Sequence, residues 1–188
     1  MKKGTILLVV VAFAAGLLVS VIFSNMNKSR PESRQAASQQ PAPAPAAVDI
    51  EQHIKVLEEI VAKEPANRQA WVELGHRYFD SQNAIKAIEA YDQALALDGN
   101  DPDVLTDQAI MFRQVGWYEK AIENFKHANE LNPKHVNSLF NMGIVYMQDL
   151  GDKEKAKEAF NRFLELVPTG PSADRAKKMI EHMEGGHG

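Results

Sequence analysis

The pattern of apolar and polar positions divides the chain into three parts. Residues 5–23 form one apolar run without a charged side chain, and residues 25–48 are rich in Pro, Ala and Gln without apolar periodicity. From residue 49 onward, apolar residues recur three and four positions apart, which is the spacing of one face of an amphipathic helix. The pattern therefore predicts a membrane-spanning helix, a linker and an all-α body at 49–188.

The body repeats with a period near 34 residues. Tyr91 and Phe125 lie 34 residues apart, whereas Pro133 and Pro168 lie 35 apart, and we expect the turn at 149–152 to carry the extra residue. A sustained period in this range is typical of repeat architectures, whose units bury their apolar faces against one another. The sequence thus predicts a stack of similar units.

Each unit is expected to contain two antiparallel helices, called helix A and helix B, joined by a short turn. In the first unit, Trp71, Leu74, Gly75 and Tyr78 share one face of helix A. Gly75 has no side chain where helix B must come close, which leaves space for the ring of Tyr91. The predicted N-caps are Asn83, Asp101 and Asp152. The predicted units are a leading helix at 49–65, repeats one to three at 68–101, 102–135 and 136–170, and a capping helix at 171–184.

The first unit resembles the tetratricopeptide repeat (TPR), whose motif is W-x2-L-G-x2-Y…A-x3-F-x2-A…P. The matching residues are Trp71, Leu74, Gly75, Tyr78, Ala87, Tyr91 and Ala94. The departures from the motif across the three units are Gly99, Gln108, Ala109 and Phe163. The resemblance covers about residues 68–168 and implies a right-handed superhelical solenoid of antiparallel helix pairs. It also implies a concave groove, lined by helix A residues, to which peptides or partner helices usually bind.

Carrying this geometry onto the chain gives a set of candidate partner-binding residues in the groove. They are Val72, His76, Phe79, Ile110, Arg113, Gln114, Phe140, Ile144 and Met147. Large apolar residues at solvent-facing repeat positions indicate a binding surface, so we expect an exposed apolar strip here. The alternative is that neighbouring helices or the terminal helices cover these side chains.

Some TPR domains clamp the C-terminal carboxylate of a partner with Lys, Asn and Arg on this face. The matching positions here are Val72, His76, Asp107, Asn137 and Asn141. Because the basic pair is missing, the sequence does not fit that class. Arg113 is the only cation expected in the groove, and it could still accept a single terminal carboxylate.

Composition narrows the function classes further. The 188-residue chain has a formal net charge of −4. Residues 1–48 hold five Lys and Arg against one Glu, whereas residues 49–188 hold 16 Lys and Arg against 24 Asp and Glu. An acidic body is a poor match for nucleic acid, whose binding depends on cations that neutralise phosphates. The absence of cysteine excludes disulfides, thiolate metal sites and a cysteine nucleophile.

Catalytic signatures are missing from the sequence. It contains no phosphate-binding loop, no dinucleotide-binding glycine motif, no G-x-S-x-G and no H-E-x-x-H. His182 and His187 stand near a Glu, but a polar chain end is a more ordinary interpretation than a metal site. Trp117, in the turn of repeat two, is expected to be partly packed rather than a binding anchor. We therefore expect no enzyme activity, no cofactor, no metal site and no small-molecule substrate.

Residues 1–24 are expected to anchor the chain in a membrane. The apolar run at 5–23 makes a helix of about 28 Å, close to the roughly 30 Å hydrocarbon core of a bilayer. A cleaved secretory signal is the alternative, although its apolar stretch is usually shorter. Basic residues flank both ends of the run, but the short tail before it favours an inside N-terminus. This predicts a single-pass inner (cytoplasmic) membrane protein with a disordered linker at 25–48 and a periplasmic body.

Together these features predict a membrane-anchored scaffold or adaptor that binds a peptide or helix of a protein partner in its concave groove. An anchor, a linker and three TPRs resemble the TPR subunits of bacterial cytochrome c maturation complexes, which implies a role in cytochrome c biogenesis. The alternative is an envelope structural or assembly factor, for secretion, pili or division, that acts through its convex face or by self-association. The expected contacts are a protein or peptide and the membrane, without nucleic acid.

Overall fold

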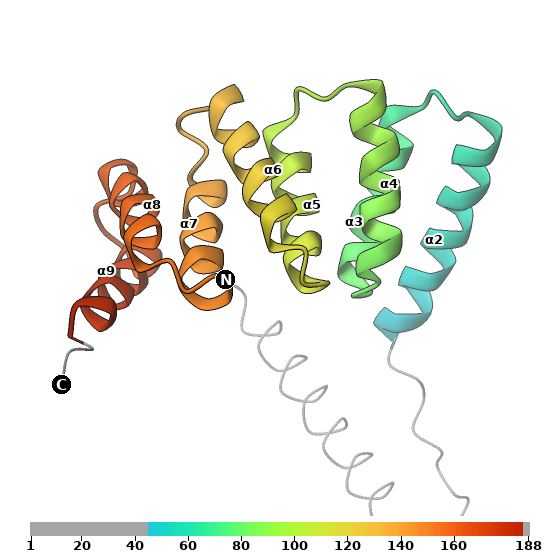
Figure 1. Ribbon diagram of the computed structural model, residues 1–188. Helices are drawn as coiled ribbons and strands as arrows, with labels where there is room; N and C mark the ends of the chain where they lie inside the picture. The colour runs from blue at the N-terminus through green and yellow to red at the C-terminus, as the bar shows by residue number, and fades with distance from the viewer. Residues whose placement is uncertain (1–44, 186–188) are drawn as a thin grey trace, which may run out of the picture. The chain divides into compact units, whose positions relative to one another are not determined.

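The computed structural model describes residues 45–185 (Figure 1), so the predicted membrane segment at 5–23 and most of the predicted linker lie outside the described residues. The elements are α2 (Pro45–Lys63), α3 (Arg68–Asp80), α4 (Ala84–Leu97), α5 (Pro102–Gln114), α6 (Tyr118–Leu131), α7 (Val136–Ile144), the π-helical turn η1 (Val145–Asp149), α8 (Lys153–Leu166) and α9 (Pro171–Gly185). None of the helices between residues 45 and 185 combines the length and the apolar character that crossing a membrane requires.

The helices form two layers, and this confirms the predicted all-α TPR solenoid (Figure 1). The A helices α3, α5 and α7 pack against their own B helices α4, α6 and α8, and each B helix also packs against the next A helix. The leading helix α2 takes the place of a B helix before the array, and α9 takes the place of an A helix after it. Each repeat therefore buries its apolar face between neighbours.

Three aromatic rings, one from each B helix, fill the centre of the repeats. They are Tyr91, Phe125 and Phe160, and all three are fully buried. A Cβ atom added to Gly143 would lie 2.7 Å from Cε1 of Phe160, and one added to Gly75 would lie 2.5 Å from Cδ1 of Tyr91. Only a missing side chain allows the A and B helices to come this close around an aromatic ring. The predicted reason for these glycines is confirmed.

The turns and caps follow the sequence signals. The side chains of Asn83, Asp101 and Asp152 accept hydrogen bonds from backbone N–H groups in the first turns of α4, α5 and α8, as predicted. The A–B turns each contain one residue with positive φ at the same repeat position, and these residues are Gln82, Gly116 and Gly151. Because glycine adopts this conformation without steric cost, the two glycines fit the turn better than Gln82 does.

The start of α2 and the place of the extra residue in repeat three differ from the prediction. Helix α2 begins at Pro45, inside the segment assigned to the linker, because proline suits the first turn of a helix and the following alanines favour helix formation. The extra residue of repeat three does not lengthen the turn at 149–152. It is taken up in η1, where Leu150 N donates to Val145 O, so that the last turn of helix A is widened.

Candidate functional site on the concave face

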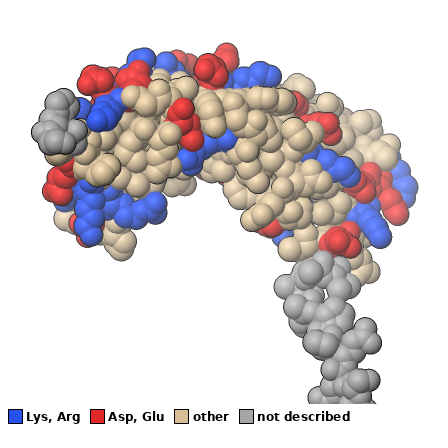
Figure 2. Space-filling model, turned by 60° about the horizontal axis from the view of Figure 1, so that its bottom comes forward, with Lys and Arg blue, Asp and Glu red and all other residues tan. Residues whose placement is uncertain are grey.

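The A helices lie next to one another and form the hollow side of the array, which Figure 2 shows with basic side chains gathered at the end near α8 and α9. Three sets of equivalent helix A positions lie opposite the helix face that packs on the B helices. The sets are Gln69, Asp103 and Asn137; Glu73, Asp107 and Asn141; and Asp80, Gln114 and Gln148. None of these nine residues is buried. We call these nine residues the concave face.

The concave face carries only carboxylates and amides. Its four acids belong to repeats one and two, whereas all three positions of repeat three carry amides. Carboxylates attract cations, and amides both donate and accept hydrogen bonds. The face can therefore hydrogen-bond to the backbone of a bound segment along its whole length, and it favours positive charges near repeats one and two.

Histidine–aspartate pairs connect neighbouring A helices. Nε2 of His76 on α3 lies 3.3 Å from Oδ2 of Asp107 on α5, and Nε2 of His135, just before α7, lies 2.9 Å from Oδ1 of Asp103 on α5. Nδ1 of His135 also lies 3.0 Å from Oγ of Ser138. These pairs fix the spacing of the A helices and hence the shape of the concave face.

The pair between His76 and Asp107 depends on protonation. The hydrogen bond to Asp107 raises the pKa of His76 above its ordinary value, and the charges of Asp107 and Glu73 act in the same direction against partial burial. The imidazole side chain is 38% exposed, so solvent screens part of this effect. Protonation makes the ring a donor at both nitrogens, and the connection between α3 and α5 therefore weakens as pH rises.

Arg113, the cation predicted for the groove, already forms hydrogen bonds with η1. Its Nε donates to Oδ2 of Asp149, and its Nη2 donates to Oε1 of Gln148 at 2.8 Å. Both acceptors belong to η1, so the widened turn ties repeat three to repeat two. The guanidinium therefore does not stand ready for a terminal carboxylate, which corrects that expectation.

Two predicted contact residues lie inside the protein. Val72 and Ile144 are each only 6% exposed, and both belong to the hydrophobic core. A position between the groove and the packed face of a helix is covered by the neighbouring helices, which periodicity within a single helix does not reveal. This corrects their assignment as groove-lining residues that a partner can reach.

The remaining predicted residues are reachable to different extents. Gln114 is exposed, and His76, Phe79, Ile110, Arg113, Phe140 and Met147 are half-buried. The ring of Phe140 packs edge-to-face on Phe160 and Phe163, with centroids 5.7 and 5.1 Å apart, and the guanidinium of Arg175 lies 5.3 Å from its centroid. Apolar spots thus alternate with polar residues, and the continuous apolar strip expected from the sequence is interrupted. Their role in binding stays a prediction.

The candidate binding residues included only one residue of the concave face, Gln114. Glu73, Asp107 and Asn141 occupy equivalent places on the three A helices, yet none was among the candidate binding residues. The signal that could have found them is the 34-residue register, because one concave-facing residue in a repeat implies its equivalents in the others.

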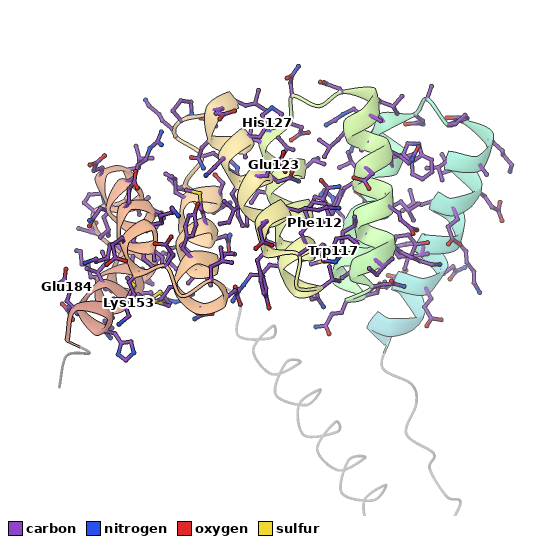
Figure 3. All side chains as sticks on the ribbon, viewed as in Figure 1. Phe112, Trp117, Glu123, His127, Lys153 and Glu184 are labelled. Carbon is purple, nitrogen blue, oxygen red and sulfur yellow. The ribbon has the colours of Figure 1, made fainter. Side chains whose placement is uncertain are left out.

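The other candidate features are structural. Trp117 lies in the turn between α5 and α6 and packs beside Phe112, with centroids 5.8 Å apart (Figure 3). Nζ of Lys120 lies 4.7 Å from the centroid of the Trp117 ring, and Trp117 is 43% exposed. Trp117 is therefore partly packed, as predicted. Between residues 45 and 185, no group of three or more His, Asp and Glu side chains is placed to hold a metal ion.

Three stretches of the chain match the tetratricopeptide repeat family, at residues 68–101, 103–135 and 137–170. Human protein O-mannosyl-transferase TMTC3 is 33% identical over 123 residues, which cover 65% of this chain but 13% of that protein. Photosystem I assembly protein Ycf3 of Prochlorococcus marinus is 30% identical over 129 residues, which cover 59% of this chain and 73% of Ycf3. The chain thus spans a small part of TMTC3 and most of Ycf3.

Solved structures share the architecture at low identity. The crystal structure of MamA superposes with a TM-score of 0.65 at 20% identity, covering 74% of this chain and 90% of MamA. The Yersinia enterocolitica type III secretion chaperone SycD, solved with a peptide of the translocator YopD, gives a TM-score of 0.58 at 18% identity, covering 62% of this chain and 91% of SycD. At these identities the likeness concerns the fold.

Proposed function

Because the chain belongs to the tetratricopeptide repeat family, we propose that it is a protein–protein interaction scaffold that holds a peptide or helix of a partner on its concave face. One observation carries the proposal. The nine positions of the concave face, on α3, α5, α7 and η1, stay reachable by solvent in all three repeats and carry hydrogen-bonding groups without a Lys or Arg. A surface that contacts only water would tolerate Lys or Arg at these positions as well as carboxylates and amides.

The chemistry of the face specifies the segment that binds. Amides in repeat three pair with the backbone of the segment, and carboxylates in repeats one and two attract Lys or Arg side chains. The half-buried rings of Phe79 and Phe140 offer apolar contacts between the polar groups. The partner segment is accordingly neutral or basic, with at least one apolar side chain. SycD, which has the same fold, was solved with a bound peptide, and this supports a binding role.

We also propose that the scaffold is anchored at the inner membrane through residues 5–23, with its body in the periplasm. The length of that apolar run supports the anchor. The finer proposal is that the scaffold acts in cytochrome c biogenesis, as a subunit of a maturation complex. The alternative is another assembly factor of the envelope, and similarity to a photosystem I assembly protein favours an assembly role in general.

The proposal is tested by capturing partners with the full-length chain in non-ionic detergent, from solubilised membranes and the periplasmic fraction of the source cells. The groove variant carries Gln114→Arg and Asn137→Arg, which place two long cations on the concave face at exposed positions. The matched control carries Gln52→Arg and Asn161→Arg, which make the same chemical change on the B-helix side.

A partner held by the wild-type chain and the control, but lost by the groove variant, is the expected result. Cytochrome c precursors or haem-lyase subunits among the lost proteins would support the finer proposal. Equal capture by all three proteins would reject the concave face as the binding site and favour the convex face.

A further inference from the structure

Two clefts open on the side of the array opposite the concave face, between B helices of successive repeats. The α2–α4 cleft has a volume of about 560 Å³ and is lined in part by Glu58, Val61, Trp71, Leu74, Tyr78 and Gln93. The α6–α8 cleft consists of two adjoining cavities of about 280 and 290 Å³, lined in part by Lys126, Leu139, Met142, Tyr146, Ala159 and Arg162. The lining positions of the two clefts are equivalent in the repeat, so the same architecture builds both.

In the equivalent space between α4 and α6, the buried side chain of Gln108 connects the two helices by hydrogen bonds. Gln108 stands where Leu74 and Met142 stand in the other repeats, and it is only 3% exposed. Its Nε2 donates to Oδ1 of Asp92 at 2.6 Å, and its Oε1 accepts from Nδ2 of Asn124 at 2.7 Å. This hydrogen-bond network lies between the two clefts, and the α6–α8 cleft forms a site of its own.

The charges of the α6–α8 cleft differ from those of its counterpart. Lys126 takes the place of Glu58, and Arg162 takes the place of Gln93. Because the fold accepts Glu and Gln at these positions, packing does not demand the two cations. Both are exposed, and neither lies within ion-pair distance of another residue among those at 45–185.

The rest of the α6–α8 cleft combines an apolar floor with two acidic side chains at its edge. Leu139 and Ala159 are buried in the floor, and Met142 covers it partly. Glu130 and Glu158 also line the cleft and set a limit on its positive charge. The cations nevertheless stand out in a body whose overall charge is strongly negative.

A buried polar atom lies at the same place. Nδ2 of Asn129 donates to Phe125 O at 2.9 Å and to Oγ of Ser138 at 2.7 Å, and the residue is 5% exposed. Its Oδ1 is buried without a hydrogen-bond partner among the described residues, and Asn129 lines the cleft. Buried acceptors in native proteins are nearly always satisfied, so this atom marks a polar spot beneath the floor of the cleft.

We propose that the α6–α8 cleft binds an extended acidic peptide segment of a partner protein. An aliphatic side chain of the segment packs on Leu139, Met142 and Ala159, and flanking carboxylates pair with Lys126 and Arg162. Lys155 and Arg162, at the two ends of the α8 lining, are seven positions apart, or about 10 Å, which an extended chain covers with roughly three residues. This site is independent of the concave face, which lies on the other side of α7 and favours neutral or basic segments.

The test uses the full-length chain in non-ionic detergent and a fluorescein-labelled peptide of sequence Glu-Leu-Asp-Leu-Glu, with binding measured by fluorescence anisotropy. The cleft variant carries Lys126→Glu and Arg162→Gln, which introduce the residues of the α2–α4 cleft. The matched control carries Lys153→Glu and Lys178→Gln, which make the same change in charge at exposed positions outside the cleft. Thermal melts followed by circular dichroism check that each variant is folded, and Arg162→Gln alone replaces the double variant if it is not.

The cleft variant should bind the peptide roughly tenfold more weakly, because two exposed charge contacts with its carboxylates are lost. The control should stay within about twofold of the wild type, and a Glu-Ser-Asp-Ser-Glu peptide should bind more weakly to all of them. Equal binding by wild type and cleft variant, or no binding by the wild type, would overturn the proposal. So would sedimentation that shows a dimer which the cleft variant abolishes, because a second copy would then occupy the cleft. The Gln114→Arg and Asn137→Arg variant should bind this peptide normally, so failure here is distinguishable from failure of the concave face.

Discussion

Gly75→Ala provides the sharpest test of how the repeats are packed. The added Cβ would lie 2.5 Å from Cδ1 of the Tyr91 ring, whereas carbon atoms in contact prefer roughly 3.5–4.0 Å. The ring would have to retreat by about 1 Å, yet it is fully buried and cannot swing into solvent. Overpacking costs roughly 1–3 kcal/mol, and the forced shift of a fully buried ring places this substitution in the upper half of that range, against a gain of roughly 1 kcal/mol from the better helix propensity of alanine.

We therefore expect Gly75→Ala to lower the free energy of unfolding by about 1–2 kcal/mol, which corresponds to a fall in Tm of roughly 2–8 °C for a chain of this length. Differential scanning calorimetry measures this directly. Gly99→Ala is the control, because its Cβ would meet only Leu95 O, at 3.5 Å, and Tm should hardly change. A Gly75→Ala protein that melts at or above the wild-type temperature would refute the close approach of α3 and α4.

Two further predictions concern buried and titrating groups. Tyr91→Phe should raise the free energy of unfolding by about 1 kcal/mol, because the Tyr91 hydroxyl is buried without a partner among the described residues and Phe125 fills the equivalent position; a lower urea midpoint would contradict this. His76→Gln should cost more stability at about pH 5.5 than at about pH 8.5. Because the pKa of His76 is raised in the folded protein, its contribution is complete below the unfolded pKa and is lost as pH rises through the folded value. Equal losses in urea midpoint at both pH values would show that the pair with Asp107 is not coupled to folding.

The sequence was sufficient to predict the helical repeats, because each structural requirement leaves a local mark. Gly75 and Gly143 mark the close approach of two helices, and Asn83 marks a helix start by its capping side chain. These marks recur at a fixed interval, so three weak local signals become one strong signal. Helix boundaries and the pairing of helices follow from them.

The binding face was harder to predict, because exposure depends on neighbouring helices. Val72 and Ile144 have groove-facing register on their own helices, but adjacent helices bury them. The sequence suggested that Arg113 is available to a ligand, but the widened turn of repeat three places Asp149 within hydrogen-bond distance of it. The sequence does not show how an inserted residue is accommodated, since the insertion can lengthen a turn or widen a helix.

The outer cleft does leave a sequence signal, which appears when equivalent repeat positions are compared. Glu58 and Lys126 occupy the same place in their repeats with opposite charge. Packing alone gives no reason for such a reversal, because the fold accepts both residues. Which of these positions line an open cleft still depends on Gln108, whose hydrogen bonds close the middle site.

Site-specific photo-cross-linking in the source cells directly tests whether the concave face holds the partner. The photoreactive residue p-benzoylphenylalanine is placed at Gln114 on the concave face or at Asn161 on α8, both exposed positions. We expect a covalent adduct with a partner protein from position 114 after irradiation and none of the same mass from position 161. Adducts from position 161 without any from position 114 would show that the concave face does not hold the partner and would place the partner on the outer side of the array.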